Sequence, residues 1–156
     1  MITIDIPGWG NMDIENIVFD LNGTIATDGR IPPGIKEKIK SIAEKAKVFI
    51  LTADTQGTAK EETRGTNAEL VKISGEDSKM GKLTFLNTLT PEMTVVIGNG
   101  NNDELILKEA ALGIAVMGDE GVSASLIRSA DIVVKNISDA LDLFLKPKRL
   151  IATLRE

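Results

Sequence analysis

A lone carboxylate at the end of an apolar run is the residue in this sequence best placed for chemistry. Residues 17–19 are all apolar and lead directly into Asp20, and an Asn22-Gly23 turn follows. Aspartate is a poor strand former and is rarely buried without a partner. At the carboxyl end of a strand in an α/β sheet, Asp20 would face the crevice where ligands bind. Taken alone, this fragment favours the simpler interpretation of an aspartate-containing turn.

Two further apolar runs end in groups that could join Asp20. Residues 48–51 end at Thr52, and residues 94–97 run into the glycine-rich segment 98–103. A parallel sheet brings the carboxyl ends of its strands to one edge, so these groups would surround one crevice. The backbone N–H groups of segment 98–103 would suit an anion or a metal ion with oxygen ligands.

Two charged residues at predicted helix starts complete the set. Lys79 opens one helix, and Asp103 lies in the first turn of another. Two carboxylates, a hydroxyl and a lysine suit phosphoryl transfer through Mg²⁺, which prefers oxygen ligands. Asp20 would attack phosphorus and form an aspartyl-phosphate. Thr52 and Lys79 would bind the phosphate oxygens as charge shifts in the transition state.

Composition narrows the chemistry further. The 156 residues include no cysteine and no histidine, which excludes disulfides, thiol chemistry, serine–histidine triads and histidine-ligated zinc. The net charge of −5 argues against a nucleic-acid or anionic-membrane partner. No apolar run approaches the length of about 20 residues that a membrane span needs, and the first residues lack the basic start of a signal peptide. We therefore expect a cytoplasmic protein that binds neither nucleic acid nor membrane.

The elements that must position these residues alternate along the chain. This rhythm predicts one α/β domain, residues 1–156, with a mostly parallel sheet flanked by helices. We expect strands at residues 1–6, 17–20, 48–52, 69–73, 94–97, 113–116 and 132–134. We expect helices at residues 35–46, 56–66, 79–89, 104–111, 122–129 and 137–144, and a last basic turn or helix at residues 148–155. The first strand and the stretch 12–16 predict an additional N-terminal β-hairpin.

In order and spacing, these motifs resemble those of the haloacid dehalogenase (HAD) superfamily of phosphotransferases. The matching stretches are Asp20-Leu21-Asn22-Gly23-Thr24, Thr52 after its strand, a lysine that opens a helix, and segment 98–103. The resemblance is strongest to the phosphorylation domain of P-type ATPases and the small soluble phosphatases related to it. It extends over residues 14–145 and implies a three-layer Rossmann-like sheet.

The resemblance implies a role for each matched residue. Asp20 matches the phosphorylated nucleophile, and Asn22 would supply a backbone carbonyl to Mg²⁺. Gly23 and Thr24 belong to the phosphate-binding turn. The phosphoryl group would also contact Thr52, Ala53, Lys79 and Asn102. The implied Mg²⁺ ligands are Asp20, Asn22, Asn99 and Asp103.

The lysine of the third motif is either Lys79 or Lys82. The spacing of Lys79 to Leu86 along the helix is more similar to that of the family, so Lys79 is preferred. This helix is also expected to point Met80, Leu83, Leu86 and Leu89 inward.

Two departures from the family pattern bear on activity. Asn22 stands where soluble phosphatases usually carry an aspartate that serves as general acid and base. Such a group contributes about 10²–10⁴-fold in rate, so Asn22 predicts a slow enzyme or a long-lived intermediate. Asn99 replaces an aspartate ligand, which predicts weaker Mg²⁺ binding. The alternative function is therefore a degenerate phosphate- or Mg²⁺-binding regulator on the same fold.

Two further expectations concern partners. A dinucleotide-binding interpretation of Gly98-Asn99-Gly100 is weaker, because Asp103 occupies the place of the third glycine. Neither inter-motif gap has room for a cap domain, so the site should be open. It would accept a large phosphorylated substrate, which the sequence does not identify, or a small one over which a neighbouring subunit closes. The missing cap and the spare hairpin both support such a homo-oligomer.

Overall fold

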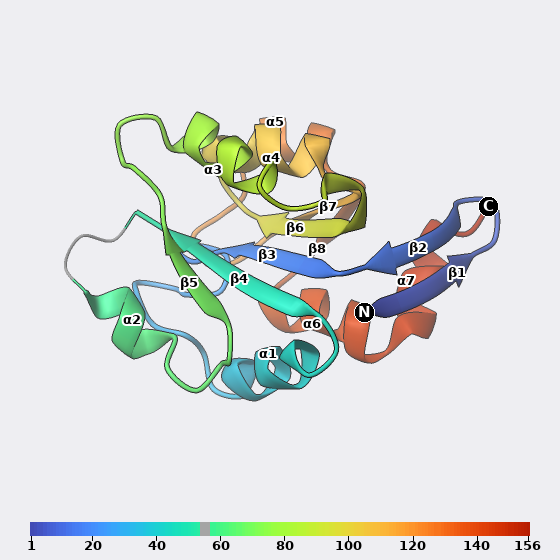
Figure 1. Cartoon of the computed structure of the whole chain (residues 1–156), viewed down its shortest axis with the longest axis horizontal. Coiled ribbons are helices and arrows are strands. Elements are labelled where there is room, and N and C mark those ends of the chain that lie inside the picture. Colours follow the sequence, from blue (N-terminus) through green and yellow to red (C-terminus); the bar gives the residue numbers. More distant parts are fainter. Residues whose placement is uncertain (54–56) are drawn as a thin grey trace.

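Six parallel strands form one sheet between two layers of helices in the computed structural model, which describes residues 1–53 and 57–156 (Figure 1). The inner strands are continuous apolar runs because helices cover both of their faces. The predicted parallel, helix-flanked α/β architecture is confirmed. The strands are β3 (Asn16–Asp20), β4 (Lys47–Thr52), β5 (Glu69–Lys72), β6 (Thr94–Gly98), β7 (Leu112–Val116) and β8 (Ile132–Val134).

The winding of the sheet changes direction at β3. The strand order is β5-β4-β3-β6-β7-β8, so the chain first adds strands on one side of β3 and then on the other. Asp20, the last residue of β3, is in register with Leu51 of β4, and Phe19 is in register with Ile97 of β6. The carboxyl ends of β3, β4 and β6 therefore meet at the switch point, where open α/β sheets bind ligands.

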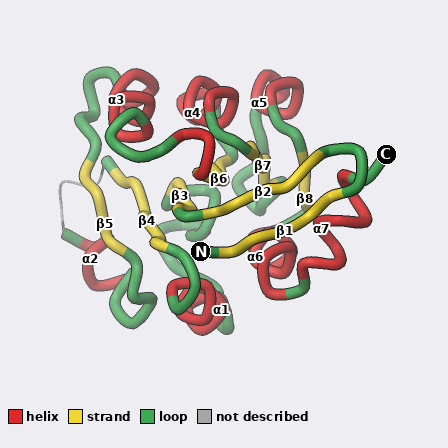
Figure 2. Tube along the Cα trace, turned by 45° about the vertical axis from the view of Figure 1, so that its right-hand side comes forward, coloured by secondary structure: helices red, strands yellow, loops and turns green. Residues whose placement is uncertain are grey.

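Helices cover both faces of this sheet (Figure 2). The helices over one face are α3 (Ser78–Leu86), α4 (Glu104–Glu109) and α5 (Ala124–Ser129). The helices on the other side are α1 (Ile35–Ala43), α2 (Thr58–Glu62), α6 (Ile137–Leu145) and α7 (Pro147–Leu154). Two 3₁₀ turns, η1 (Pro91–Met93) and η2 (Asn101–Asp103), precede β6 and α4.

Alternate residues of β3 reach opposite helical layers. Ile17 and Phe19 join the core cluster that contains Ile39 of α1, whereas Val18 joins the cluster that contains Leu86 of α3. All five side chains are fully buried. Burial stabilises a side chain of this kind by about 1.5–3 kcal/mol relative to exposure. The two cores together fix β3, and with it Asp20, in position.

The predicted N-terminal hairpin is present and packs against its own chain. β1 (Ile2–Ile6) pairs in antiparallel register with β2 (Gly10–Ile14), which leads directly into β3. The inward side chains Ile4 and Ile6 are buried in the same cluster as Leu150 of α7. Figure 1 shows α7 alongside the hairpin. The hairpin is therefore not spare, and this support for a homo-oligomer is withdrawn.

The predicted helix from residue 79 exists as α3, but its buried face differs from the expected one. Met80 was expected to point inward and is 47% exposed, whereas Lys82 is only 4% exposed. In α3, residues Ser78, Lys82 and Leu86 are spaced by four, so they share the inner face of the helix. The prediction for Met80 was wrong because leucine spacing alone set the orientation of the helix.

The connections beside the switch point are short. The predicted helix at residues 56–66 is confined to α2, and Gln56 lies outside the described residues. After β3 the chain forms a turn closed by the bridges Asn22–Ala26 and Thr27–Arg30. Within residues 1–53 and 57–156, neither the segment between β3 and α1 nor the segment between β4 and α3 holds a cap domain. Across the same residues, no helix combines the length and apolar character that a bilayer crossing requires.

Candidate active site

Asp20 occupies the centre of the switch point. Its side chain is 15% exposed, and its Oδ1 accepts a hydrogen bond from Nζ of Lys82 at 3.1 Å. The backbone N–H of Leu21 continues the sheet by donating to the carbonyl of Leu51. The strand register therefore places the Asp20 carboxylate at the carboxyl edge of the sheet, while residues 17–19 of the same strand stay buried.

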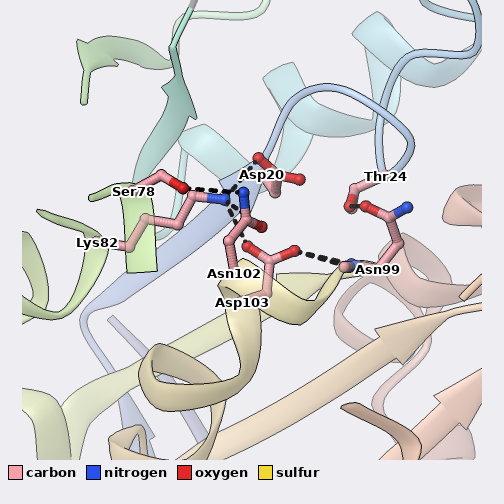
Figure 3. A network of polar contacts seen from close by, with 8 residues as sticks. Asp20, Thr24, Ser78, Lys82, Asn99, Asn102 and Asp103 are labelled. Atoms are coloured by element: carbon pink, nitrogen blue, oxygen red, sulfur yellow. Dashed lines mark hydrogen bonds and ion pairs between the residues drawn. The ribbon is translucent and has the colours of Figure 1, made fainter. Parts of the chain in front are cut away.

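Lys82, and not Lys79, is the lysine at this site. Its Nζ donates to Asp20, to Oδ1 of Asp103 at 2.7 Å and to Oδ1 of Asn102 at 3.1 Å (Figure 3). Lys79 is 40% exposed, and its ion pair with Glu104 is long, at 3.9 Å. The preference for Lys79 is corrected: residue 82 lies on the inner face of α3, whereas residue 79 lies to its side.

The start of α3 explains how Lys82 reaches the site. Asp77 caps the helix by accepting a hydrogen bond from the N–H of Met80 at 3.2 Å. One turn before Lys82, the hydroxyl of Ser78 accepts a hydrogen bond from Nδ2 of Asn102 at 3.2 Å. Asn102 thus links Ser78 to Lys82, a contact that the sequence analysis missed. The four-residue spacing of Ser78 and Lys82 places both on one face of a helix, and it could have indicated that they share a partner.

Asp103 closes the other side of the lysine. Its side chain is 2% exposed. Its Oδ2 accepts the backbone N–H groups of Asn99 at 3.0 Å and Gly100 at 3.1 Å. A Cβ on Gly98 would lie 2.5 Å from the Asp103 carboxylate, which explains why glycine ends β6. Because Asp103 already uses these N–H groups, the dinucleotide-binding interpretation loses the donors that it needed.

The charges of this cluster do not balance. Asp20 and Asp103 face one Lys82, which leaves one uncompensated negative charge when both carboxylates are ionised. Burial, and then the charge of Asp103, raise the pKa of Asp20 to about 7, although Lys82 works in the other direction. Burial opposes the Lys82 ammonium, but the two carboxylates outweigh it and raise the pKa of Lys82. An added cation would therefore be favoured here.

The turn after Asp20 lies against Asn99. Gly23 adopts a left-handed conformation with φ of 81°, and its N–H donates to the carbonyl of Ala26 at 2.8 Å. The hydroxyl of Thr24 donates to Oδ1 of Asn99 at 3.0 Å (Figure 3). The structure thus brings the expected phosphate-binding turn and Asn99 together, and a direct hydrogen bond between their side chains joins them.

The remaining predicted residues lie at the same edge of the sheet, and two of them line the pocket there. Thr52 ends β4, next to β3, and is 4% exposed. Ala53 and Asn22 line a pocket of about 490 Å³ together with Asp20 and Lys82. The other lining residues are Ile73, Gly75, Ser78, Asn99, Gly100, Asn101 and Asn102. A larger hollow of about 690 Å³ lies at the opposite edge of the sheet and contains none of the predicted residues.

The donors in the crevice match Mg²⁺ in kind. Asp20 and Asn22 line the pocket and offer a carboxylate and a backbone carbonyl, both of which are hard oxygen ligands, whereas the oxygens of Asp103 already accept from Lys82 and from two backbone N–H groups. The unbalanced charge of the cluster favours a cation in the same place. In the described part of the chain, no three acidic side chains gather into a ready-made metal site. A bound Mg²⁺ would therefore keep several waters.

Sequence comparison identifies two informative relatives, both from Methanocaldococcus jannaschii. Uncharacterized protein MJ0073 is 55% identical over 82 residues, which cover 50% of this chain and 88% of that protein. A soluble P-type ATPase-like phosphatase is 29% identical over 140 residues, or 87% of this chain. The match covers 51% of the phosphatase, so the chain spans about half of its length. No protein-family profile matches the chain.

Solved structures show the same fold. The 3-deoxy-D-manno-octulosonate 8-phosphate phosphatase of Moraxella catarrhalis, in complex with magnesium, phosphate and KDO, superposes with a TM-score of 0.71 at 13% identity. This match covers 91% of this chain and 94% of that one. A Legionella pneumophila hydrolase assigned to the HAD superfamily gives a TM-score of 0.67 at 16% identity, with 90% and 86% coverage. The resemblance read from the motifs is confirmed at the level of the fold.

Proposed function

The chain belongs to the same family as MJ0073 of M. jannaschii and has the HAD-like fold, and from this premise we propose that it is a Mg²⁺-dependent phosphatase. It acts through an aspartyl-phosphate on Asp20. The observation that carries this proposal is the three-way contact of Asp20, Lys82 and Asp103 at the switch point of the sheet. The phosphatase names of the relative and of the solved structures support it.

The nucleophile is prepared by its neighbours. Lys82 holds Oδ1 of Asp20 at 3.1 Å, which orients the carboxylate toward the pocket. An oxygen of Asp20 attacks the phosphorus of a phosphomonoester, a P–O bond to the leaving group breaks, and an acyl-phosphate forms. The Lys82 ammonium, the hydroxyl of Thr52 and the backbone of the Gly23-Thr24 turn bind the phosphoryl oxygens. Water then cleaves the acyl-phosphate and regenerates the Asp20 carboxylate.

Two residues that line the pocket would hold the metal ion. These are Asp20 and Asn22, through its backbone carbonyl, beside the surplus negative charge that Asp103 adds to the cluster. A bound Mg²⁺ would neutralise the charge that develops on the phosphoryl oxygens. The magnesium in the Moraxella structure supports this choice of metal.

Asn22 sets the expected rate. It is exposed, lines the pocket and follows Asp20 by two residues. Its amide cannot give a proton to the leaving group or take one from water, so the chain lacks this contribution of about 10²–10⁴-fold. The phosphoenzyme is accordingly slow to hydrolyse. The protein acts in the cytoplasm on a phosphorylated substrate, with an open site that a large substrate or a neighbouring subunit covers.

Hydrolysis of an aryl phosphate with Mg²⁺ tests this function. Wild type is compared with Asp20→Asn, and with Asp5→Asn as a control on the exposed outer face of β1. We expect slow, metal-dependent turnover that Asp20→Asn loses and Asp5→Asn keeps. Equal rates for wild type and Asp20→Asn would exclude the phosphatase function. The alternative would then remain, a phosphate- or Mg²⁺-binding regulator, which the amides at positions 22 and 99 favour.

A further inference from the structure

Asn99 stands where the resemblance implies an acidic metal ligand, but its amide is engaged on both sides. The hydroxyl of Thr24 donates to Oδ1 at 3.0 Å, and Nδ2 donates to the carbonyl of Gly121 at 3.3 Å. Figure 3 shows the Asn99 amide beside Thr24 and apart from the contacts of Lys82. The side chain therefore joins the turn after β3 to the loop after β7.

Chemistry fixes the orientation of this amide. The carbonyl of Gly121 can only accept a hydrogen bond, so the nitrogen of Asn99 must face it and the oxygen must face Thr24. An ionised carboxylate only accepts hydrogen bonds. An aspartate at position 99 would thus keep the Thr24 contact and set an oxygen against the Gly121 carbonyl. Among these two residue types, only asparagine can make both contacts.

Close packing reinforces the same junction. A Cβ on Gly23 would lie 2.4 Å from Nδ2 of Asn99, and a Cβ on Gly118 would lie 3.2 Å from the carbonyl oxygen of Gly23. The backbone of Asn99 adds a contact, because its carbonyl accepts the N–H of Ser123 at 2.8 Å. The turn at residues 22–26, Asn99 and the loop at residues 118–121 therefore form one packed wall of the site.

We propose that Asn99 is a positioning residue that holds the Gly23-Thr24 turn in its phosphate-binding shape, and that it is not a metal ligand. The inference rests on the proposed function, in which this turn binds the phosphoryl group. It revises the ligand set implied by the resemblance, since the oxygen of Asn99 serves Thr24. The metal ion would then depend on Asp20 and the Asn22 carbonyl, which line the pocket, and on bound waters.

The first test compares two variants with the same added charge. Asn99→Asp should lower the melting temperature of the metal-free protein by about 3–8 °C, because it loses a hydrogen bond and opposes two oxygens. Asn101→Asp should shift it by less than about 2 °C, because a carboxylate still accepts the hydroxyl of Ser123. Calorimetric titration should give Mg²⁺ dissociation constants for the two variants that agree within about threefold.

Two results of this test would overturn the inference. One is an unchanged melting temperature for Asn99→Asp. The other is Mg²⁺ binding about tenfold or more tighter in Asn99→Asp than in Asn101→Asp, which is the gain expected of a new charged ligand.

The second test measures the equilibrium affinity for inorganic phosphate. Asn99→Ala and Thr24→Val should each weaken it about 5–10-fold, and the double variant should lose little more, because both remove one contact. Thr24→Ser keeps the hydroxyl and should retain the wild-type affinity. Additive losses, or unchanged phosphate affinity in Asn99→Ala, would refute a positioning role.

The two proposals fail in different ways. If wild type shows Asp20-dependent hydrolysis while the Asn99 variants match it in melting temperature and phosphate affinity, only the inference on Asn99 falls. If wild type shows neither phosphate binding nor Asp20-dependent hydrolysis, the proposed function falls and the phosphate role of the turn falls with it.

Discussion

Nζ of Lys82 lies 3.1 Å from Oδ1 of Asp20, although 62 residues of sequence separate them. The same nitrogen lies 2.7 Å from Asp103, so one buried cation holds the buried carboxylate of Asp103 and the partly buried carboxylate of Asp20. Removing one member of such a cluster leaves charge without a partner in the protein interior. The contacts of Lys82 therefore serve both the stability of the fold and the proposed chemistry of Asp20.

Replacement of the two candidate lysines separates their roles. Lys82→Met should reduce aryl phosphate hydrolysis by about 10²-fold or more and cost about 3–5 kcal/mol of unfolding free energy, because the buried Asp103 and the partly buried Asp20 lose their partner. Lys79→Met is the matched control and should cost at most about 1 kcal/mol, because its ion pair is exposed. Steady-state rates and urea unfolding measure both effects. A Lys79→Met protein as impaired as Lys82→Met would contradict the assignment.

Restoring a carboxylate at position 22 should accelerate turnover. Asn22→Asp supplies the missing proton donor and acceptor next to the pocket, and we expect an increase of about 10-fold or more. The phosphoenzyme should become shorter-lived in the same variant. Rapid-quench measurement of its decay checks this expectation. If Asn22→Asp leaves both quantities unchanged, the amide does not limit the rate.

The pKa of Asp20 predicts how stability depends on pH. Because its pKa is raised from 3.8 to about 7, the folded protein holds this proton more tightly than the unfolded chain does. The stabilising contribution of the protonated carboxyl is therefore present below about pH 4 and is lost as pH rises toward about 7. Asp20→Asn has no such proton, so its unfolding free energy should fall less between about pH 5 and pH 8. Urea unfolding of both metal-free proteins is the measurement, and parallel pH profiles would count against the burial of Asp20.

Asp142 offers a prediction remote from the site. Its carboxylate contacts Lys38 of α1 at 2.8 Å and Arg149 of α7 at 3.1 Å, so it ties both helices to α6. The hydrogen bond from Lys38 is the main cause of its lowered pKa. Asp142→Asn should cost about 1–3 kcal/mol near neutral pH and leave hydrolysis unchanged.

The pH dependence of that variant has a definite sign. A lowered carboxyl pKa in the folded state stabilises the protein above 3.8, and this contribution is lost as pH falls through the lowered value. The difference in unfolding free energy between wild type and Asp142→Asn should therefore shrink in acid. A difference that grows in acid would contradict the role assigned to Asp142.

Much of the fold could be predicted because buried parallel strands are short apolar runs. Residues 48–51 and 94–97 are such runs, and the register of β4 and β6 against β3 then brings their ends to Asp20. The helix expected at residues 35–46 is present as α1, where Ile35 and Ile39, four residues apart, both lie inward. Local pattern therefore determined which elements form and which strand ends share the crevice.

The choice of lysine could not be made from the same pattern. Leucine spacing favoured an inward Met80, but α3 turns Lys82 inward, where two carboxylates compensate its burial. That compensation depends on Asp20 and Asp103, which are distant in sequence. The contacts of Asn99 with Thr24 and Gly121 also join residues that are distant in sequence. The sequence therefore identified Asn99 as a site residue but could not predict its two hydrogen-bond partners.

The most direct test of the central claim is whether Asp20 carries a phosphoryl group. Wild type and Asp20→Asn are incubated with acetyl phosphate and Mg²⁺, quenched in acid and examined by intact-mass and peptide mass spectrometry. The proposed mechanism predicts one added phosphoryl group on the peptide that contains Asp20, removed by hydroxylamine and missing from Asp20→Asn. A wild-type protein that remains unmodified while it hydrolyses acetyl phosphate, or one modified at another residue, would contradict it.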